Sequence, residues 1–171
     1  MLIVSTTSCV VPFPLEAEPP ETKDSPRFLR EYNVPQFKAD VKIDSNDDLI
    51  LHFVVEDKNV YDDIPGRIFK DYALAPDSQK LRTIVAFINI AGSDPNIVPE
   101  EEAPVVREFE FAIQSKLLCS SEQGDISGST HYIEVVIANA FDPSSEVYPK
   151  FRATVGPEDV WSFLVVCVQT N

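Results

Sequence analysis

The chain has 171 residues, enough for one ordinary domain with an arm beside it, and its 44% hydrophobic and 25% charged content is typical of a globular protein. The formal net charge of −14 at pH 7 disfavours non-specific binding to nucleic acid and to anionic membranes, because these surfaces carry the same sign. Only five glycines are present, which leaves little material for a phosphate-binding loop, whereas the 14 prolines stiffen connections.

Residues 1–35 are predicted to form an extended N-terminal arm. Prolines recur between positions 12 and 35, where they remove amide donors and disfavour a helix. The apolar residues near the tip, which are the predicted partner-binding residues, are Leu2, Ile3, Val4, Val10, Val11 and Phe13. Two arrangements remain open: the tip folds back as an edge strand on its own domain, or it adds a strand to a neighbouring subunit.

The N-terminus also bears on localisation. The first basic residue is Lys23, so the positive region of an export signal is missing. No stretch approaches the ~20 apolar residues that span a bilayer. We therefore expect a protein that is neither secreted nor transmembrane.

Three strands are predicted in the first half of the domain, and the first is the clearest. Residues 36–44 alternate strictly, with apolar side chains on one face and charged ones on the other. A turn at 45–48 leads to a second strand at 49–56. An acidic loop at 59–66 ends in Pro65-Gly66, a turn pair, and is followed by a third strand at 67–75.

The hydrophobic period then changes and predicts a helix over residues 78–91. Asp77 or Ser78 supplies the N-cap, and Gly92 supplies the C-terminal stop. The apolar residues fall at the i, i+3, i+4, i+7 spacing of one helical face, at Leu81, Ile84, Val85 and Ile88.

Residues 106–171 return to the two-residue period of strands. We predict strands at 106–114, 131–141, 147–155 and 160–169, with turns at 142–145 and at Gly156-Pro157. The last strand is apolar on both faces, so it should lie centrally or be covered by another subunit. Residues 36–171 are therefore expected to form a single mainly β domain of about seven strands with one helix, either an OB-like barrel or a β-sandwich.

Three stretches resemble a family of small phage proteins that are similar to single-strand DNA-binding OB-folds. The stretches are Asp48-Leu-Ile-Leu-His-Phe-Val-Val-Glu56, Pro65-Gly-Arg-Ile-Phe-Lys-Asp-Tyr72 and Lys80-Leu-Arg-Thr-Ile-Val-Ala-Phe-Ile-Asn-Ile-Ala-Gly92. The resemblance covers about residues 48–92 and excludes the arm and the last thirty residues. It implies an OB-type barrel whose helix follows the third strand, and it raises single-strand DNA binding as one possible function.

Binding of a single strand requires a basic groove with stacking aromatic rings. The candidate residues lie on the first and third predicted strands, and they are Lys38, Lys42, Arg67, Lys70 and Tyr72. Residues 83–171 carry four basic and 13 acidic residues, so no continuous positive track crosses the second half of the chain. Nucleic-acid binding is therefore the alternative interpretation, and solvated strand faces with a core tyrosine account equally for these residues.

No catalytic, metal or cofactor signature stands out. Cys9, Cys119 and Cys167 are odd in number and widely spaced, so we expect reduced thiols packed as small apolar groups. His52 and His131 are expected to be structural residues of strands. The acidic runs Asp62-Asp63 and Glu100-Glu-Glu102 lack the order of a calcium loop.

The sequence thus favours a non-enzymatic structural or assembly protein, plausibly a component of a phage or viral particle, found in the virion or the host cytoplasm. Its expected partners are other protein subunits, in a homo-oligomer or a hetero-assembly, and the arm would dock on them by strand addition. The alternative is an OB-fold accessory protein that binds single-stranded DNA.

Overall fold

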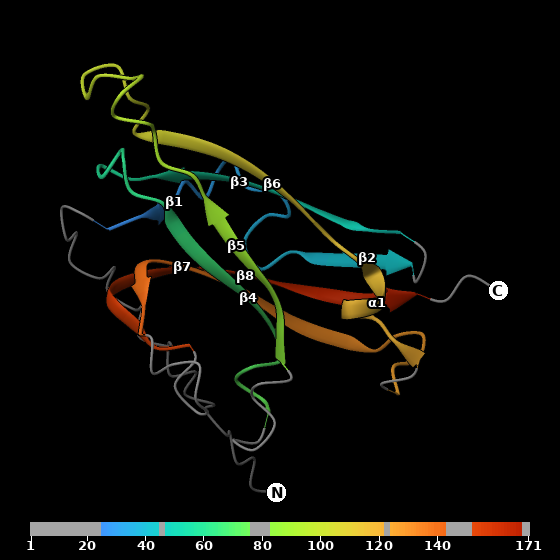
Figure 1. Cartoon of the computed structure of the whole chain (residues 1–171). Coiled ribbons are helices and arrows are strands. Elements are labelled where there is room, and N and C mark those ends of the chain that lie inside the picture. The colour runs from blue at the N-terminus through green and yellow to red at the C-terminus, as the bar shows by residue number, and fades with distance from the viewer. Residues whose placement is uncertain (1–24, 45–46, 76–82, 122–123, 143–151, 169–171) are drawn as a thin grey trace, which may run out of the picture.

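The computed structural model describes residues 25–44, 47–75, 83–121, 124–142 and 152–168 (Figure 1). Within these ranges the chain forms eight strands and one short helix. Their bounds are β1 Arg27–Phe28, β2 Asp40–Asp44, β3 Leu49–Glu56, β4 Ile64–Lys70, β5 Ile84–Ile90, β6 Val106–Ile113, α1 Ser115–Leu118, β7 Thr130–Phe141 and β8 Thr154–Val168.

The strands form two sheets. The smaller sheet has the order β1-β3-β6, and the larger has the order β2-β8-β7-β4-β5. All pairs are antiparallel except β2 with β8, which is parallel. The larger sheet curls strongly, and β3 and β6 lie above it in Figure 1. With β2 set aside, β1, β3 and β6 occupy the positions of strands A, B and E of an immunoglobulin-type sandwich, and β8, β7, β4 and β5 those of G, F, C and C′.

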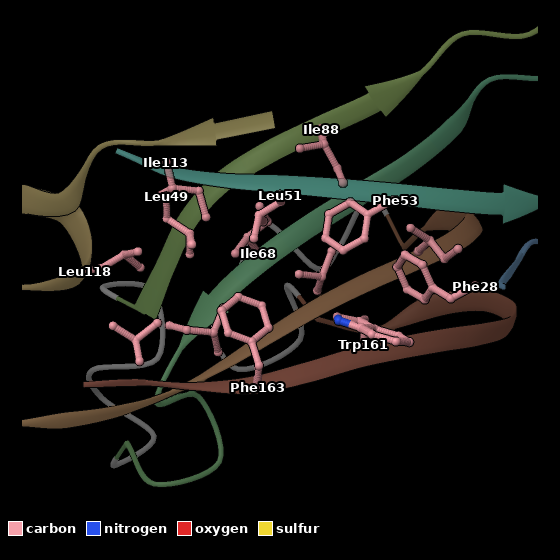
Figure 2. Packing of buried hydrophobic residues seen from close by; sticks show 14 of the residues in the cluster. Phe28, Leu49, Leu51, Phe53, Ile68, Ile88, Ile113, Leu118, Trp161 and Phe163 are labelled. Atoms are coloured by element: carbon pink, nitrogen blue, oxygen red, sulfur yellow. The ribbon is translucent and has the colours of Figure 1, made fainter. Parts of the chain in front are cut away.

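Both sheets contribute to one hydrophobic core. Phe53 of β3 and Trp161 and Phe163 of β8 are fully buried in it, and side chains from the two sheets converge on the same interior (Figure 2). Burial of each such side chain contributes about 1.5–3 kcal/mol. The indole Nε1 of Trp161 keeps a partner inside the core, because it donates to the carbonyl of Pro35 at 2.9 Å.

The prediction of a mainly β domain is confirmed, and its two packed sheets with the curled larger one combine features of both expected architectures. The strands predicted at 49–56 and 106–114 correspond to β3 and β6, and that at 131–141 to β7. The apolar C-terminal strand is central as expected, because β8 lies between β2 and β7.

Two predicted turns are wrong, because they lie inside strands. Pro65-Gly66 belongs to β4, which begins at Ile64 and ends at Lys70. Gly156-Pro157 belongs to β8, where the register with β7 shifts and Gly156 has a φ of 84°. Glycine at a bulge bends a strand without ending it. Of the strand predicted at 147–155, residues 147–151 lie outside the described residues.

The predicted helix at 78–91 is also wrong where the structure describes it, because Ile84–Ile90 form β5. The register of β5 with β4 shifts so that Phe69 pairs with Ile84 and Ile68 pairs with Ala86. The extra residue, Val85, breaks the alternation of the strand and produces the helix-like spacing. Asp77, Ser78 and Leu81 lie outside the described residues.

The described end of the predicted arm belongs to the domain. Arg27–Phe28 pair with β3, and the Phe28 ring packs on Phe53 and Trp161 at centroid distances of 5.3 and 5.9 Å. Val34 forms an isolated bridge with His52. Residues 25–35 therefore complete the sandwich in the same chain. The predicted partner-binding residues of the tip (Leu2, Ile3, Val4, Val10, Val11 and Phe13) lie outside the described residues.

Candidate functional site

Two features of the described chain are candidates for function: a buried polar cluster beside a disulfide, and an uncharged sheet edge. The disulfide joins Cys119, directly after α1, to Cys167, near the end of β8. It corrects the prediction of reduced thiols for these two residues. The two cysteines are 48 residues apart in the sequence, but their Cα atoms are 5.6 Å apart, because the segment after β6 lies next to the end of β8. Cys9 lies outside the described residues.

His131 of β7 is the centre of the polar cluster. Its Nδ1 lies 2.7 Å from Oδ2 of Asp71, and its Nε2 lies 3.1 Å from Oδ1 of Asp125. The side chain of His131 is only 10% exposed. An imidazole placed between two carboxylates in this way has both ring nitrogens directed at negative charge.

Asp71 fixes the orientation of this imidazole. It directly follows β4 with a φ of 54°, and its N–H donates to the carbonyl of Tyr132 at 2.8 Å. Its Oδ1 accepts the N–H of Tyr132 at 2.7 Å, while its Oδ2 faces His131. With Asp71 accepting at Nδ1, the Nε2 of His131 must point toward Asp125.

Asp125 is held from the opposite side. Its Oδ2 accepts the ammonium of Lys70 at 3.1 Å and the N–H of Ser120 at 2.9 Å. Burial raises the pKa of Asp125, but the Ser120 hydrogen bond, Lys70 and His131 outweigh it and leave the pKa below its ordinary value of 3.8. The carboxylate is therefore ionised at neutral pH, and its Oδ1 faces Nε2 of His131.

The five residues predicted for nucleic-acid binding do not line one groove. Lys38 precedes β2 and Lys42 lies on it, whereas Arg67 and Lys70 lie on β4, and β8 and β7 separate the two strands. The charge of Lys70 is paired with Asp125. Tyr72 packs on Phe69 at a centroid distance of 5.1 Å, under the guanidinium of Arg152. This arrangement provides no continuous basic track with stacking rings.

The other candidates from the sequence have local roles. Asp63 caps the neighbouring turn by accepting the N–H of Gly92 and the amide of Asn89. The residues Glu100, Glu101 and Glu102 are exposed. His52 lies on β3 with its Nδ1 3.9 Å from Glu110. Sequence reasoning missed Asp71 and Asp125, because Asp71 is 60 residues from His131 and the six-residue spacing of Asp125 and His131 matches no known motif.

The second candidate feature is β5, an edge of the larger sheet. In the described part of the chain it pairs with β4 alone. Its sequence, Ile-Val-Ala-Phe-Ile-Asn-Ile, contains no charged residue, proline or glycine. The other long edges carry charges, with Asp40, Lys42 and Asp44 on β2 and Arg107, Glu108 and Glu110 on β6. Charges of this kind protect an edge from pairing with another chain, and β5 lacks them.

The outward face of β5 is uncharged and presents one large apolar side chain, Phe87, beside the polar Asn89. Phe87 is 64% exposed and stands beside the guanidinium of Arg67, whose Cζ is 5.5 Å from its ring centroid. The same guanidinium lies 4.1 Å from the ring centroid of Phe141 on β7. Phe87 therefore extends an aromatic and cationic surface to the open edge.

Comparisons with known proteins assign neither a family nor an activity to this chain. No family model and no curated protein matches this chain. Among the solved structures that match is the CARDB domain of the PF1109 protein from Pyrococcus furiosus, crystallised in complex with di-metal ions. It is 8% identical, with a TM-score of 0.39 over 86% of this chain and 94% of that one. A likeness of this degree says nothing about activity or ligands.

One further property concerns membranes. Within the described ranges, none of the helical structure is both long and apolar enough to cross a bilayer.

Proposed function

We propose that this chain is a non-enzymatic structural subunit of a larger assembly, of the kind that forms a phage or other viral particle. Its N-terminal segment would add a strand to β5 of a neighbouring copy. The observation that carries the proposal is the edge of β5, which in the described part of the chain has no strand beyond it and no charged residue or proline, so that the bulge at Val85 is its one protective feature.

The N-terminal segment has the chemistry that this edge requires. Its first charged residue is Glu16, so residues 1–15 are as free of charge as β5 itself. Leu2, Ile3 and Val4 form a short run of β-prone residues at the tip. An added strand gains main-chain hydrogen bonds, while side chains such as Phe87 give the contact its specificity.

The acidic character of the chain fits the same role. A net charge of −14 keeps free subunits apart by long-range repulsion, which falls steeply beyond about 10 Å at 0.1 M salt. The contact between the arm and β5 involves no charged residue, so salt would weaken the repulsion between subunits without weakening this contact. Assembly should therefore strengthen as salt concentration rises.

The test is the oligomeric state of the full chain, measured by light scattering coupled to size-exclusion chromatography over a range of concentrations. Phe87→Lys places a charge at the open edge and should shift the protein to monomers. Ile97→Lys is the matched control, because Ile97 is an apolar residue that is 77% exposed and lies in the loop after β5, not on the edge strand itself. It should assemble like the parent chain.

A second variant tests the other half of the contact. Replacing Leu2, Ile3 and Val4 with lysine should abolish assembly to the same extent as Phe87→Lys. If the parent chain is monomeric at every concentration, or if both variants still assemble, the proposal is wrong. A monomer whose melting temperature falls on changing the tip would instead show that the segment docks on its own domain.

A further inference from the structure

We propose that the pocket around His131 is a redox-gated zinc site, which binds Zn²⁺ through Asp125, His131, Cys119 and Cys167 once the disulfide is reduced. The proposal does not depend on the assembly role, because the site involves neither β5 nor the N-terminal arm. It rests on the geometry of four side chains, three of them from residues 119–131 and the fourth from the end of β8.

The potential donor atoms are already close together. A carboxylate oxygen of Asp125, a ring nitrogen of His131 and the sulfur of Cys167 all lie within 4.8 Å of one another. Cys119 brings a second sulfur, since it is bonded to Cys167. In a tetrahedral zinc site with metal–ligand bonds of about 2.0–2.3 Å, neighbouring donor atoms are roughly 3.3–3.8 Å apart. Small side-chain movements are enough to bring Asp125, His131 and Cys167 to these separations. Cys119 is outside this group of three, so its sulfur would have to turn toward the other donors once the disulfide is open.

The second observation is an unsatisfied nitrogen. Nε2 of His131 is buried and forms no hydrogen bond, although Oδ1 of Asp125 lies 3.1 Å away. When the imidazole is neutral and its Nδ1 proton is donated to Asp71, the lone pair of Nε2 faces a carboxylate oxygen directly. A cation between these two atoms removes the conflict and satisfies both of them.

The residues around the proposed ligands form the kind of hydrogen bonds that orient zinc ligands in proteins. A ligating histidine usually donates its other ring N–H to a carboxylate, which Asp71 provides here at 2.7 Å. Asp125 uses Oδ2 for Lys70 and Ser120, which leaves Oδ1 for a metal. Two thiolates and the carboxylates of Asp125 and Asp71 are opposed by Zn²⁺ and the Lys70 ammonium, so the filled pocket would carry a single net negative charge, next to the partly exposed Asp71.

The gating step is the reduction of one disulfide. A dithiol reductant transfers two electrons and two protons to the Cys119–Cys167 bond, breaks it, and is itself oxidised to a disulfide. Zn²⁺ then displaces a proton from each thiol, so two protons are released to solvent. In the reverse direction a disulfide oxidant takes two electrons from the two thiolates and is itself reduced to a dithiol, which takes up two protons. The Cys119–Cys167 bond forms again and the metal leaves, because a disulfide sulfur is a poor ligand for zinc.

The experiment uses the full chain, either oxidised or reduced with a phosphine that consumes the disulfide. Each form is incubated with ZnCl₂ and desalted, and its zinc content is measured by mass spectrometry. Co²⁺ serves as a spectroscopic probe, because thiolate coordination gives a charge-transfer band. We expect one zinc per reduced chain and none per oxidised chain.

Four variants test the site: one changes a ligand, two are controls and one changes the residue that supports the ligand His131. His131→Gln should weaken binding at least 10-fold and change the Co²⁺ spectrum, whereas His52→Gln and Cys9→Ser should match the parent chain. Asp71→Asn keeps all four ligands and should weaken binding about 10- to 100-fold. Circular dichroism of each reduced protein reports whether it is folded.

Three results would overturn the proposal. One is a reduced parent chain that retains no zinc. Another is His131→Gln binding as tightly as the parent chain, since thiols of an unfolded chain would then account for the metal. The third is equal zinc content in the oxidised and reduced forms.

Discussion

Arg107 is a buried cation that organises the acidic loop between β3 and β4. Its guanidinium donates to the carbonyl oxygens of Asp62, Ala91 and Asn59 at 2.8, 3.3 and 2.7 Å. It also lies 3.5 Å from the carboxylate of Asp57, which is equally buried. One side chain on β6 therefore joins the loop before β4 to the chain after β5.

We expect Arg107→Met to lower the free energy of unfolding by about 3–5 kcal/mol, because it leaves the Asp57 carboxylate and three carbonyl oxygens without their cation. Urea unfolding followed by circular dichroism measures this loss. Lys58→Met removes a positive charge from an exposed position of the same loop and should change the free energy by less than about 0.5 kcal/mol. Equal effects of the two substitutions would contradict a structural role for Arg107.

Asp63 gives a prediction about pH. The Gly92 N–H and then the Asn89 amide, aided by Arg107 and opposed by burial, lower the pKa of Asp63 below its ordinary value of 3.8. A carboxyl whose pKa is lower in the folded protein than in the unfolded chain stabilises the fold above pH ~3.8. That contribution is lost as pH falls through the folded-state pKa.

Asp63→Asn should therefore lower the urea midpoint by a constant amount between pH 5 and 7, and the gap to the parent chain should narrow below pH ~3.8. Asp62→Asn is the matched control from the adjacent exposed position. A gap that persists unchanged to pH 2 would show that the Asp63 charge is not responsible.

At the scale of elements, Gly92 shows how a glycine can be required by space alone. A Cβ at this position would collide with the backbone of Tyr61 and would lie 2.9 Å from the carbonyl carbon of Asp62. The sequence suggested a helix stop at Gly92, whereas its actual role is to let two backbone segments approach each other. A backbone cannot move aside as the end of a side chain can.

Gly92→Ala should therefore cost about 3 kcal/mol of stability. Gly156→Ala should cost only about 1–2 kcal/mol, because the added Cβ meets no atom within 4 Å and the penalty comes from the φ of 84° alone. Thermal unfolding of both variants gives the comparison. A cost for Gly92→Ala below that for Gly156→Ala would contradict the crowding argument.

Elements with a regular alternation could be predicted from the sequence, and those that contain a bulge could not. In β6 the pattern Val-Arg-Glu-Phe-Glu-Phe-Ala-Ile has no interruption, and its prediction was confirmed. In β5 one extra residue at Val85 shifts the phase, and the resulting apolar spacing matches a helix. The β-branched residues of β5, at Ile84, Val85, Ile88 and Ile90, were the signal that favoured a strand.

The polar cluster was beyond sequence reasoning for a related reason. Its members follow β4, lie between α1 and β7, and close β8, so only the topology of the sheets brings them together. The histidine itself was noted as a strand residue. Its two carboxylate partners, Asp71 and Asp125, are 60 and 6 residues away, and no short motif has that spacing.

At the scale of the whole molecule, the disulfide connects the two halves of the sandwich. Cys119 follows β6 of the smaller sheet, and Cys167 lies in β8, an interior strand of the larger sheet. A crosslink that closes a loop of 48 residues removes about 4 kcal/mol of loop-closure entropy from the unfolded chain in the chain-entropy estimate. The disulfide therefore adds to the stability that the packing of the two sheets provides.

We expect reduction of the full chain in the presence of a chelator to lower the free energy of unfolding by about 2–4 kcal/mol. Cys119→Ala should reproduce this loss without a reductant and should not respond to one, whereas Cys9→Ser should leave the oxidised protein unchanged. Urea unfolding with and without reductant measures all of these effects. An unchanged free energy of unfolding on reduction would contradict this prediction. It would mean that packing alone holds the end of α1 against β8 and that the crosslink adds no stability.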